Sequence, residues 1–235
     1  MAYIIQDTTL SRIAEAIRAK NGTTDKIKVS DMAAKIEAIK AGGDDKAAAI
    51  IDRSITEYSN GSIETIGDYA FYHCSSLLSV DLPAATSIGG SAFDSCTSLT
   101  TVDLPAATSI GGSAFAACIS LATVVMPAAT SIGANAFYYC DKLTTVDLPM
   151  ATSIGAYVWS SCSTLKALII RTGQVCSLAS GLGYGIDSCY IYVPRALVND
   201  YKAATNWAQY ADKFRALEDY TVDGTTTGEL DTTKI

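Results

Sequence analysis

Apolar residues in the middle of the chain recur with a constant 22-residue period. The clearest column is aromatic and consists of Phe71, Phe93, Phe115, Phe137 and Trp159. The same step generates the columns that begin at Ile66, Leu77, Val80 and Leu82. Five columns in one register predict five copies of a repeat over residues 66–172.

One copy shows how such a repeat can fold. Val102 and Leu104 alternate as the inward residues of a strand, and Pro105, which has no N–H, ends strand pairing. Gly111 is expected to permit a turn, and residues 113–118 to form a short helix held only by burial. Each copy has an apolar face that only its neighbours can cover. We therefore expect an α+β repeat solenoid, a leucine-rich-repeat stack of about five to six rungs.

The segments before the repeats have a different pattern. Leu10, Ile13 and Ile17 share one helical face, and Ser30 is a typical N-cap for a second helix. Residues 1–42 are thus predicted to form a small helical hairpin. Two short helices bury little surface by themselves, so this module is expected to dock on a partner or to form a homo-oligomer. Residues 43–65 are predicted to be a linker followed by a capping strand.

The segments after the repeats are expected to close the stack. Residues 190–194 resemble a sixth rung, and the apolar residues of 195–219 suit a helical cap over the last rung. Residues 173–220 are therefore predicted to form a final irregular rung and a helical C-terminal cap. Residues 221–235, rich in Thr, Asp and Gly, are predicted to be a flexible tail.

Charge and hydropathy narrow the possible partners. The net charge of −7 argues against nucleic-acid binding, which needs a basic face. Because no apolar run approaches the ~20 residues that span a bilayer, membrane insertion is not expected. Residues 1–20 lack a basic start followed by an apolar segment, so we expect no signal peptide. A protein of this kind acting outside a cell would leave by another route, such as host lysis.

The seven cysteines do not have the spacing of a metal site. Five recur once per repeat, at Cys74, Cys96, Cys118, Cys140 and Cys162. There is no Cys-x-x-Cys pair, and the single histidine, His73, cannot complete a mixed zinc site. Parallel stacking also points neighbouring Cβ vectors the same way, which disfavours disulfides. The spacing predicts a column of buried thiols, and no metal or cofactor is expected.

No catalytic constellation emerges from the sequence. The counterparts of His73 in the other copies are Ser95, Ala117, Tyr139 and Ser161. His73 is thus a surface variant rather than a base held in place by the repeat. Residues 181–185, Gly-Leu-Gly-Tyr-Gly, lack the following helix and lysine of a phosphate loop and are predicted to be a turn. We expect the protein not to be an enzyme.

Two sets of surface positions are candidates for recognition. The first is a column of outward strand positions, Asp81, Asp103 and Asp147, interrupted by Val125. It could form a cation or polar-ligand face, or a solvated strand surface that discourages aggregation. The second set flanks the cysteines and includes Tyr72, His73, Asp94, Tyr138 and Tyr139. It could form a recognition face or reflect neutral variation on a surface.

The repeat resembles a known family. Its pattern is Ala-Phe-x-x-Cys-x-x-Leu-x-x-Val-x-Leu-Pro with Ile-Gly before it, over about 105 residues. This pattern resembles the BspA-like (Treponema-type) bacterial leucine-rich repeats. It differs from the eukaryotic type because Ala107 replaces the ladder asparagine. The resemblance implies a surface or secreted protein involved in adhesion and host contact.

The N-terminal module has a resemblance of its own. Residues 10–39, with Ile-Arg-Ala-Lys-Asn-Gly and Val-Ser-Asp-Met-Ala, resemble a module at the start of phage and prophage tail-associated proteins of Gram-positive gut bacteria. It implies a virion component, assembled in the bacterial cytoplasm beside other virion proteins, that attaches to a host or bacterial surface protein or glycan. The alternative is a bacterial cell-surface or secreted adhesin.

Overall fold

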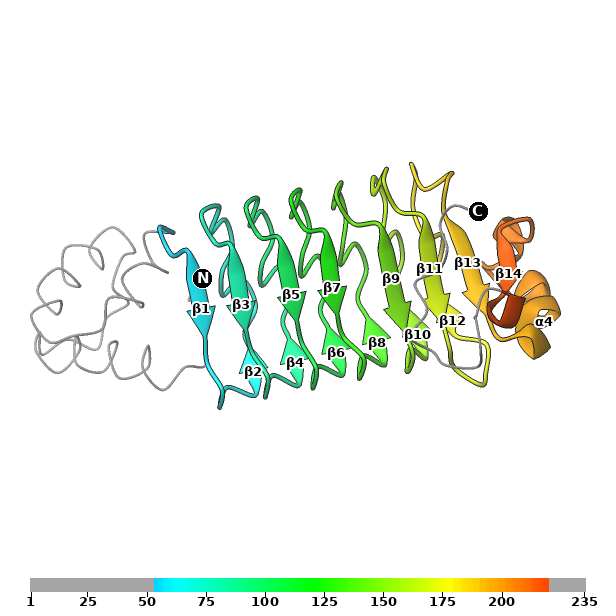
Figure 1. Cartoon of the computed structure of the whole chain (residues 1–235), viewed down its shortest axis with the longest axis horizontal. Helices are drawn as coiled ribbons and strands as arrows, with labels where there is room; N and C mark the ends of the chain where they lie inside the picture. The colour runs from blue at the N-terminus through cyan, green and yellow to red at the C-terminus, as the bar shows by residue number, and fades with distance from the viewer. Residues whose placement is uncertain (1–52, 220–235) are drawn as a thin grey trace, which may run out of the picture.

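Each copy of the repeat folds into one turn of a parallel β-solenoid. In the computed structural model, which describes residues 53–219, about seven such turns follow one another along a straight axis (Figure 1). The predicted repeat stack is confirmed, with more turns than the five to six expected from the sequence. The predicted helical hairpin of residues 1–42 and the predicted tail of residues 221–235 lie outside the described residues.

One side of the solenoid carries the longer strands. They are β1 (Glu57–Ser59), β3 (Ser79–Asp81), β5 (Thr101–Asp103), β7 (Thr123–Val125), β9 (Thr145–Leu148), β11 (Ala167–Ile170), β13 (Tyr190–Val193) and β14 (Phe214–Ala216). They form two four-stranded parallel sheets, β1-β3-β5-β7 and β9-β11-β13-β14. The register places Val80 beside Val102 and Val102 beside Val124, so each valine is paired with its counterpart in the next copy.

The opposite side carries strands of two residues each. They are β2 (Thr65–Ile66), β4 (Ser87–Ile88), β6 (Ser109–Ile110), β8 (Ser131–Ile132), β10 (Ser153–Ile154) and β12 (Ser177–Leu178). They form one six-stranded parallel sheet in which Ile88, Ile110 and Ile132 are direct neighbours. The isoleucines point inward and the serines outward, as the alternation of a strand requires.

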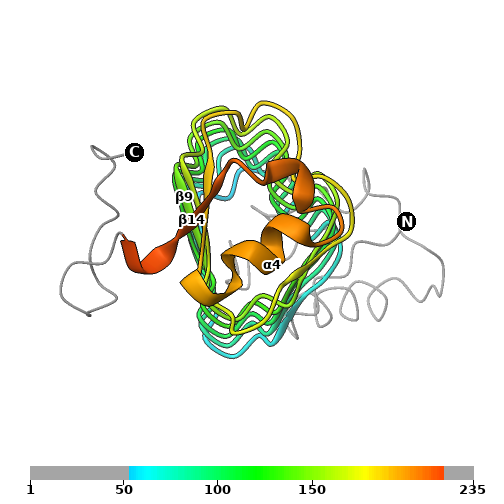
Figure 2. The same ribbon diagram turned by 90° about the vertical axis from the view of Figure 1, so that its right-hand side faces the viewer.

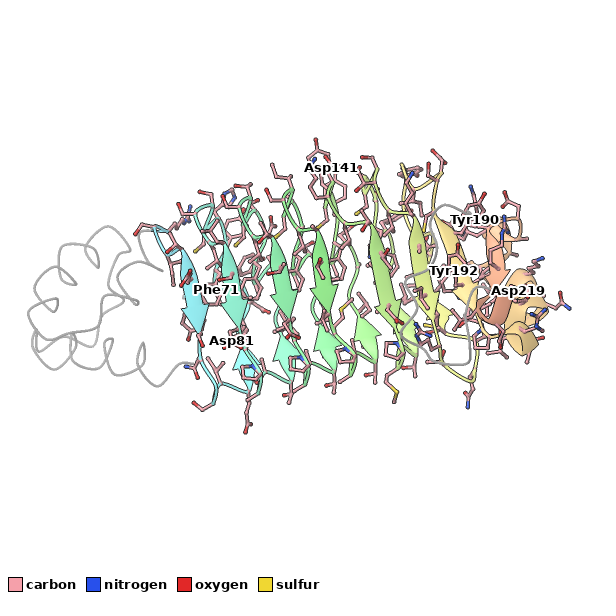
Figure 3. All side chains as sticks on the ribbon, in the orientation of Figure 1. Phe71, Asp81, Asp141, Tyr190, Tyr192 and Asp219 are labelled. Carbon is pink, nitrogen blue, oxygen red and sulfur yellow. The ribbon has the colours of Figure 1, made fainter. Side chains whose placement is uncertain are left out.

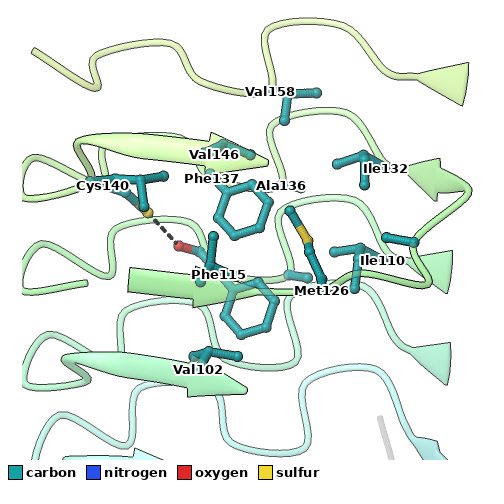
Figure 4. Close-up of a cluster of buried hydrophobic side chains, with 14 of the residues drawn as sticks. Val102, Ile110, Phe115, Met126, Ile132, Ala136, Phe137, Cys140, Val146 and Val158 are labelled. Carbon is teal, nitrogen blue, oxygen red and sulfur yellow. Dashed lines mark hydrogen bonds between the residues drawn. The ribbon is translucent and has the colours of Figure 1, made fainter. Parts of the chain in front are cut away.

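The aromatic column fills the space between the two sides (Figure 4). The ring of Phe115 is fully buried and stacks on Phe93 at 5.2 Å and on Phe137 at 5.4 Å, with the planes within 6° of parallel. Such pairs contribute about 0.5–1.5 kcal/mol beyond the burial of their area. The column continues to Trp159, so the same contact recurs along the whole repeat region.

The third side of each turn is not helical, and the expected short helix is wrong. Residues 113–118 form successive turns, with Ser113 at φ 55° and Ala117 at φ 53°. A left-handed residue interrupts a right-handed helix. The N–H groups of these residues point at the next turn instead, donating to Ala134 O at 2.8 Å and to Tyr138 O at 2.7 Å. The third side is therefore hydrogen-bonded from turn to turn like the two strand sides.

The repeated glycine has a different role from the one expected. In residues 53–219, the glycines with positive φ are Gly183 and Gly185, so Gly111 does not supply a left-handed turn. A Cβ on Gly111 would lie 2.5 Å from the carbonyl carbon of Gly89. The glycine is needed because two successive turns approach each other too closely for a side chain.

The predicted thiol column is confirmed. All seven cysteines are free and buried, and four of them donate a hydrogen bond to a phenylalanine carbonyl 25 residues earlier. Cys140 Sγ, for example, donates to Phe115 O at 3.2 Å (Figure 4). Burial raises the pKa of Cys96 and Cys118, because the thiolate would lose its hydration.

The C-terminal end of the solenoid is closed by mixed structure rather than by the expected helical cap. It consists of η2 (Arg195–Leu197), α4 (Val198–Ala203), η3 (Ala208–Tyr210), strand β14 and η4 (Leu217–Asp219). α4 lies across the end of the stack (Figure 2). The helix stops after six residues because Ala204 is extended, and Asn206 follows in a left-handed conformation. β14 then adds a strand to β13.

Aromatic side chains fix this closing segment. Tyr201, Trp207 and Phe214 are buried and contact one another, with ring centroids 5.4–5.9 Å apart. Trp207 Nε1 donates to Cys176 O at 2.6 Å, which ties the segment to the last irregular turn. The prediction that the apolar residues of 195–219 cover the end of the stack is therefore correct. The prediction that they do so as helices is wrong for much of the segment, which includes the strand β14. Within residues 53–219, the structure contains no helix with the length and apolar character needed to cross a bilayer.

Candidate recognition surface

The aspartate column lies on the outer surface of the longer strands, where Figure 3 marks Asp81. Asp81 and Asp103 are exposed neighbours in register, and Val125 follows them. Asp147 is half-buried and forms a bidentate ion pair with Arg171, with Nη2–Oδ2 at 2.8 Å and Nε–Oδ1 at 3.0 Å. The structure thus gives Asp147 a positive partner within the protein, which leaves two of the three aspartates to act together.

Within the described part of the chain, no group of three or more His, Cys, Asp or Glu side chains is arranged to hold a metal ion. Asp81 accepts a hydrogen bond from the Ser59 hydroxyl at 3.0 Å. A pair of exposed carboxylates with a serine is a weak basis for cation binding, because hard cations take six or more oxygen ligands. The arrangement fits the solvated strand surface better than the cation face.

The second candidate set lies on a ridge along the third side of the solenoid. In each copy, the ridge consists of the residues two before, one after and two after the aromatic column; the first copy supplies Tyr69, Tyr72 and His73. These three rings contact one another, Tyr69–Tyr72 at 5.7 Å and Tyr72–His73 at 4.2 Å. Asp94 follows in the next copy, and its carboxylate accepts a hydrogen bond from the Ser95 hydroxyl at 2.8 Å.

The fourth copy supplies the other tyrosines that the sequence singled out. Tyr138 and Tyr139 are both exposed and have ring centroids 6.1 Å apart. Asp141, just beyond them, stands at the upper rim in Figure 3. The structure therefore separates the candidate ridge residues into two aromatic groups, with the small residues Ser91, Ser113 and Ala117 between them.

Sequence reasoning missed three exposed tyrosines of the same ridge region: Tyr69, Tyr157 and Tyr184. Tyr157 stands in the same column as Tyr69, two residues before the aromatic position, so stepping by whole repeats from either would have found both. Tyr184 lies in the irregular turn and has no counterpart at that spacing. It is the most exposed large apolar side chain of residues 53–219, at 76%.

The N–H groups of the ridge are hydrogen-bonded within the solenoid, some within their own turn and others to the following turn. The N–H groups of His73, Ser95, Ala117, Tyr139 and Ser161 donate to carbonyls of the following turn at 2.6–2.8 Å. A ligand that binds by adding a strand needs free N–H and C=O groups. A partner of the ridge would therefore contact its side chains and would not pair with its main chain as an added strand.

The cysteines of the last irregular turn are buried and do not line the ridge. A reactive cysteine needs a lowered pKa and exposure, whereas burial raises the pKa of Cys176 and of Cys189 to about 12. His73 is exposed, and its ring packs on Tyr72. The groups brought together on the ridge are phenol rings, an imidazole, the Asp94 carboxylate and small hydroxyls.

The relation to known proteins follows from the repeat. Residues 53–175 match, in six copies, the family described as the BspA type leucine rich repeat region, which covers more than half of the chain. The chain belongs to this BspA-type family. The resemblance of the repeats is thereby confirmed. The resemblance of residues 10–39 lies outside the match and outside the described residues.

Two solved structures are similar to this BspA-type chain. One is a leucine rich cell surface protein from Faecalibacterium prausnitzii A2-165, with 18% identity and a TM-score of 0.45, over 62% of this chain and 50% of that one. The other is a leucine-rich repeat protein from Bacteroides ovatus ATCC 8483, with 19% identity and a TM-score of 0.36, over 60% and 56%. The chain thus spans about half the length of each. No curated protein matches it.

Proposed function

We propose that this chain is a non-enzymatic binding protein that attaches to a cell surface through the ridge. The observation that carries the proposal is the gathering of exposed tyrosines there: Tyr69, Tyr138, Tyr139 and Tyr157. Tyrosine combines a large contact area with a low entropy cost, because it has only two side-chain torsions. Tyrosine is also enriched where proteins contact partners.

The contrast between frame and ridge supports the same proposal. Inward positions hold nearly the same residue in every copy. In contrast, one ridge column whose members are all at least partly exposed reads His73, Ser95, Ala117, Tyr139 and Ser161. The frame fixes where each side chain stands because the turns are hydrogen-bonded to each other. Different chemistry can therefore be presented at regular intervals without disturbing the core.

The proposed partner is a host or bacterial surface protein or glycan. We favour a bacterial cell-surface or secreted adhesin, because the repeat region is what assigns the chain to its family. A virion component is the second candidate, and the sequence resemblance of residues 10–39 to tail-associated modules favours it. Immunogold labelling of the producing bacterium and of particles released from it separates the two locations.

The binding test compares two surfaces of one molecule. The labelled protein is titrated onto bacterial and host cells. The double variant Tyr138→Ala/Tyr139→Ala is expected to lose about 30-fold in affinity, since two interfacial tyrosines at about 1 kcal/mol each contribute about 2 kcal/mol. The matched control is Asp81→Asn/Asp103→Asn on the strand surface, which should bind like the unmodified chain. Equal loss in both variants, or loss only in the aspartate variant, contradicts the assignment to the ridge.

Self-association through residues 1–42 belongs to the same proposal. The two short amphipathic helices that the sequence predicts there would have more apolar surface than they can cover alone. Sedimentation of the full chain should therefore give an oligomer, and a chain beginning at Gly43 should give a monomer. The same monomeric mass for both would contradict this part of the proposal.

A further inference from the structure

Three segments far apart in the sequence meet at the C-terminal end of the ridge. They are the turn of Tyr157, the irregular loop 181–185, and residues Gln209 and Tyr210 of the closing segment. The N–H of Tyr157 donates to Gly181 O at 2.7 Å, and the N–H of Leu182 donates to Tyr210 Oη at 2.8 Å. The Gln209 carboxamide also lies beside Gly181. The region is therefore assembled only when the closing segment is in place.

The loop at the centre of this region is held rigidly. Gly183 has φ +132°, and a Cβ there would lie 2.3 Å from the Cα of Ser160. The N–H of Tyr184 donates to Ser160 Oγ at 3.2 Å, and its carbonyl accepts from the N–H of Ser161 at 2.6 Å. The backbone on both sides of Tyr184 is thus fixed, and the close approach to Ser160 accounts for the glycine at position 183.

The fixed backbone presents an open aromatic surface. Tyr184 is 76% exposed, and its ring lies nearly parallel to that of Tyr157, with centroids 6.1 Å apart and an interplanar angle of 15°. An exposed ring on a rigid backbone contributes contact area with little loss of entropy on binding. The Tyr210 phenol is protonated at neutral pH, and burial raises its pKa further. Its oxygen already accepts from the N–H of Leu182, so its O–H remains to donate to a ligand.

The chemistry of the four side chains restricts the ligand. Tyr157, Tyr184, Gln209 and Tyr210 are uncharged at neutral pH, so they provide no counter-charge for a phosphate or a carboxylate. The backbone beside them is paired between turns, so a peptide cannot add a strand. What remains is a flat ring face beside hydroxyl and amide groups. These groups match a neutral sugar, which has an apolar C–H face and hydroxyls around its edge.

We propose that Tyr184 and Tyr157, with Gln209 and Tyr210 at their edge, form a binding site for a neutral oligosaccharide. The sugar ring stacks on the open face of Tyr184. Gln209 Nε2 already donates to Asn206 O at 2.7 Å, and Tyr210 Oη already accepts from the N–H of Leu182. The sugar hydroxyls therefore donate to Gln209 Oε1 and accept from the Tyr210 hydroxyl. This inference rests on the proposed function and names the ligand class of one end of the ridge.

The test uses the full chain and three linear probes, cellohexaose, maltohexaose and chitohexaose, in isothermal titration. At least one probe is expected to bind. Tyr184→Ala should weaken that binding about tenfold, whereas Tyr184→Phe, which keeps the ring, should stay within about twofold. The matched control is Val125→Ala, which shortens an exposed apolar side chain on the strand surface, away from the ridge, and should leave sugar binding unchanged. Because no charge takes part, the affinity should be equal at low and high salt.

Four results would overturn the inference: no binding of any probe, unchanged affinity of Tyr184→Ala, equal loss in Val125→Ala, or strong salt dependence. Melting of each variant checks that the fold persists. If sugars fail while cell binding still depends on Tyr138 and Tyr139, the oligosaccharide site is wrong and the proposed function stands. If Tyr184 carries sugar binding while cell binding is independent of the ridge tyrosines, the proposed function is wrong and the site remains.

Discussion

The central turns and the C-terminal end of this solenoid are stabilised in different ways. In the central turns, a residue forms a hydrogen bond with the equivalent residue of the preceding repeat. Thr108 Oγ1 donates to Thr86 O, and Thr130 Oγ1 donates to Thr108 O, both at 3.1 Å. At the C-terminal end, the contacts are made once, as when Trp207 donates to Cys176 O. When one repeated hydrogen bond is lost, the equivalent bonds in the other turns remain. When a contact that occurs once is lost, no equivalent contact holds the same segment. The proposed sugar site lies in the second region.

The largest expected effects come from the aromatic residues of the two regions. Phe115→Ala should lower the free energy of unfolding by about 3–5 kcal/mol, because the fully buried ring lies between two others. Trp207→Ala should cost a similar amount and also leave the Cys176 carbonyl without its donor.

Hydrogen exchange distinguishes these two variants. Trp207→Ala should release the amides of β11–β13 while those around Phe93 stay protected, because each turn of a solenoid depends on its neighbours alone. Phe115→Ala should release amides on both sides of its own turn. If both variants opened the entire stack together, the two regions would be one cooperative unit.

The next prediction concerns the distance between the backbones of neighbouring central turns at the repeated glycine. In Gly133→Ala, the new Cβ would lie 2.4 Å from Gly112 N, a contact that requires the backbone to shift. We expect a loss of about 1–3 kcal/mol, as for other overpacked sites. The matched control is Gly112→Ala, whose Cβ would meet only Ala134 O at 3.4 Å. Urea denaturation of the two variants measures the difference, and equal stabilities would contradict the close-approach role of the glycine.

The core of the central turns could be predicted from the sequence because the residues that recur every 22 positions are also the buried ones. The repeat period alone located Phe115, Cys118 and Val102 in the core, and all three are buried. The third side was mispredicted, since nothing in the residues Ser113 and Ala117 indicates a left-handed conformation that the neighbouring turn stabilises. A hydrogen bond between turns is a tertiary contact, and a local pattern does not contain it.

The C-terminal end and its candidate site were less predictable. The apolar residues of 195–219 predicted a segment that covers the end of the stack. The strand β14 forms because the free edge of β13 pairs with it, and this tertiary contact overrides the local helical spacing. Tyr138 and Tyr139 were found by comparing copies. Tyr184 and Tyr210 have no copies, and they meet only through the loop 181–185 and the closing segment.

The buried thiols predict a smaller effect that depends on pH. Burial raises the pKa of Cys118 above its usual 9.0, so its contribution to stability is complete below pH 9 and is lost as the pH rises through the folded pKa. Above pH 9, each such thiol should lower the free energy of unfolding by about 1.4 kcal/mol per pH unit. The variant Cys118→Ala should show a shallower fall between pH 9 and 10, measured by urea denaturation. The same slope as the unmodified chain would mean that this thiol titrates while folded.

The smallest expected effect is the loss of one hydrogen bond from the central turns, and one hydrogen bond of the C-terminal end serves as its comparison. Thr108→Val removes the bond from Oγ1 to Thr86 O, but that carbonyl still accepts from the N–H of Thr108 at 2.8 Å. The loss should be about 0.5 kcal/mol, the lower end of the range for a hydrogen bond. Tyr210→Phe instead deprives the N–H of Leu182 of its acceptor, and an orphaned donor costs about 1–3 kcal/mol. Thermal unfolding should therefore rank Tyr210→Phe below Thr108→Val. The reverse order would mean that the ladder, rather than the unique contacts, limits stability, and that the end of the solenoid tolerates change as readily as its middle.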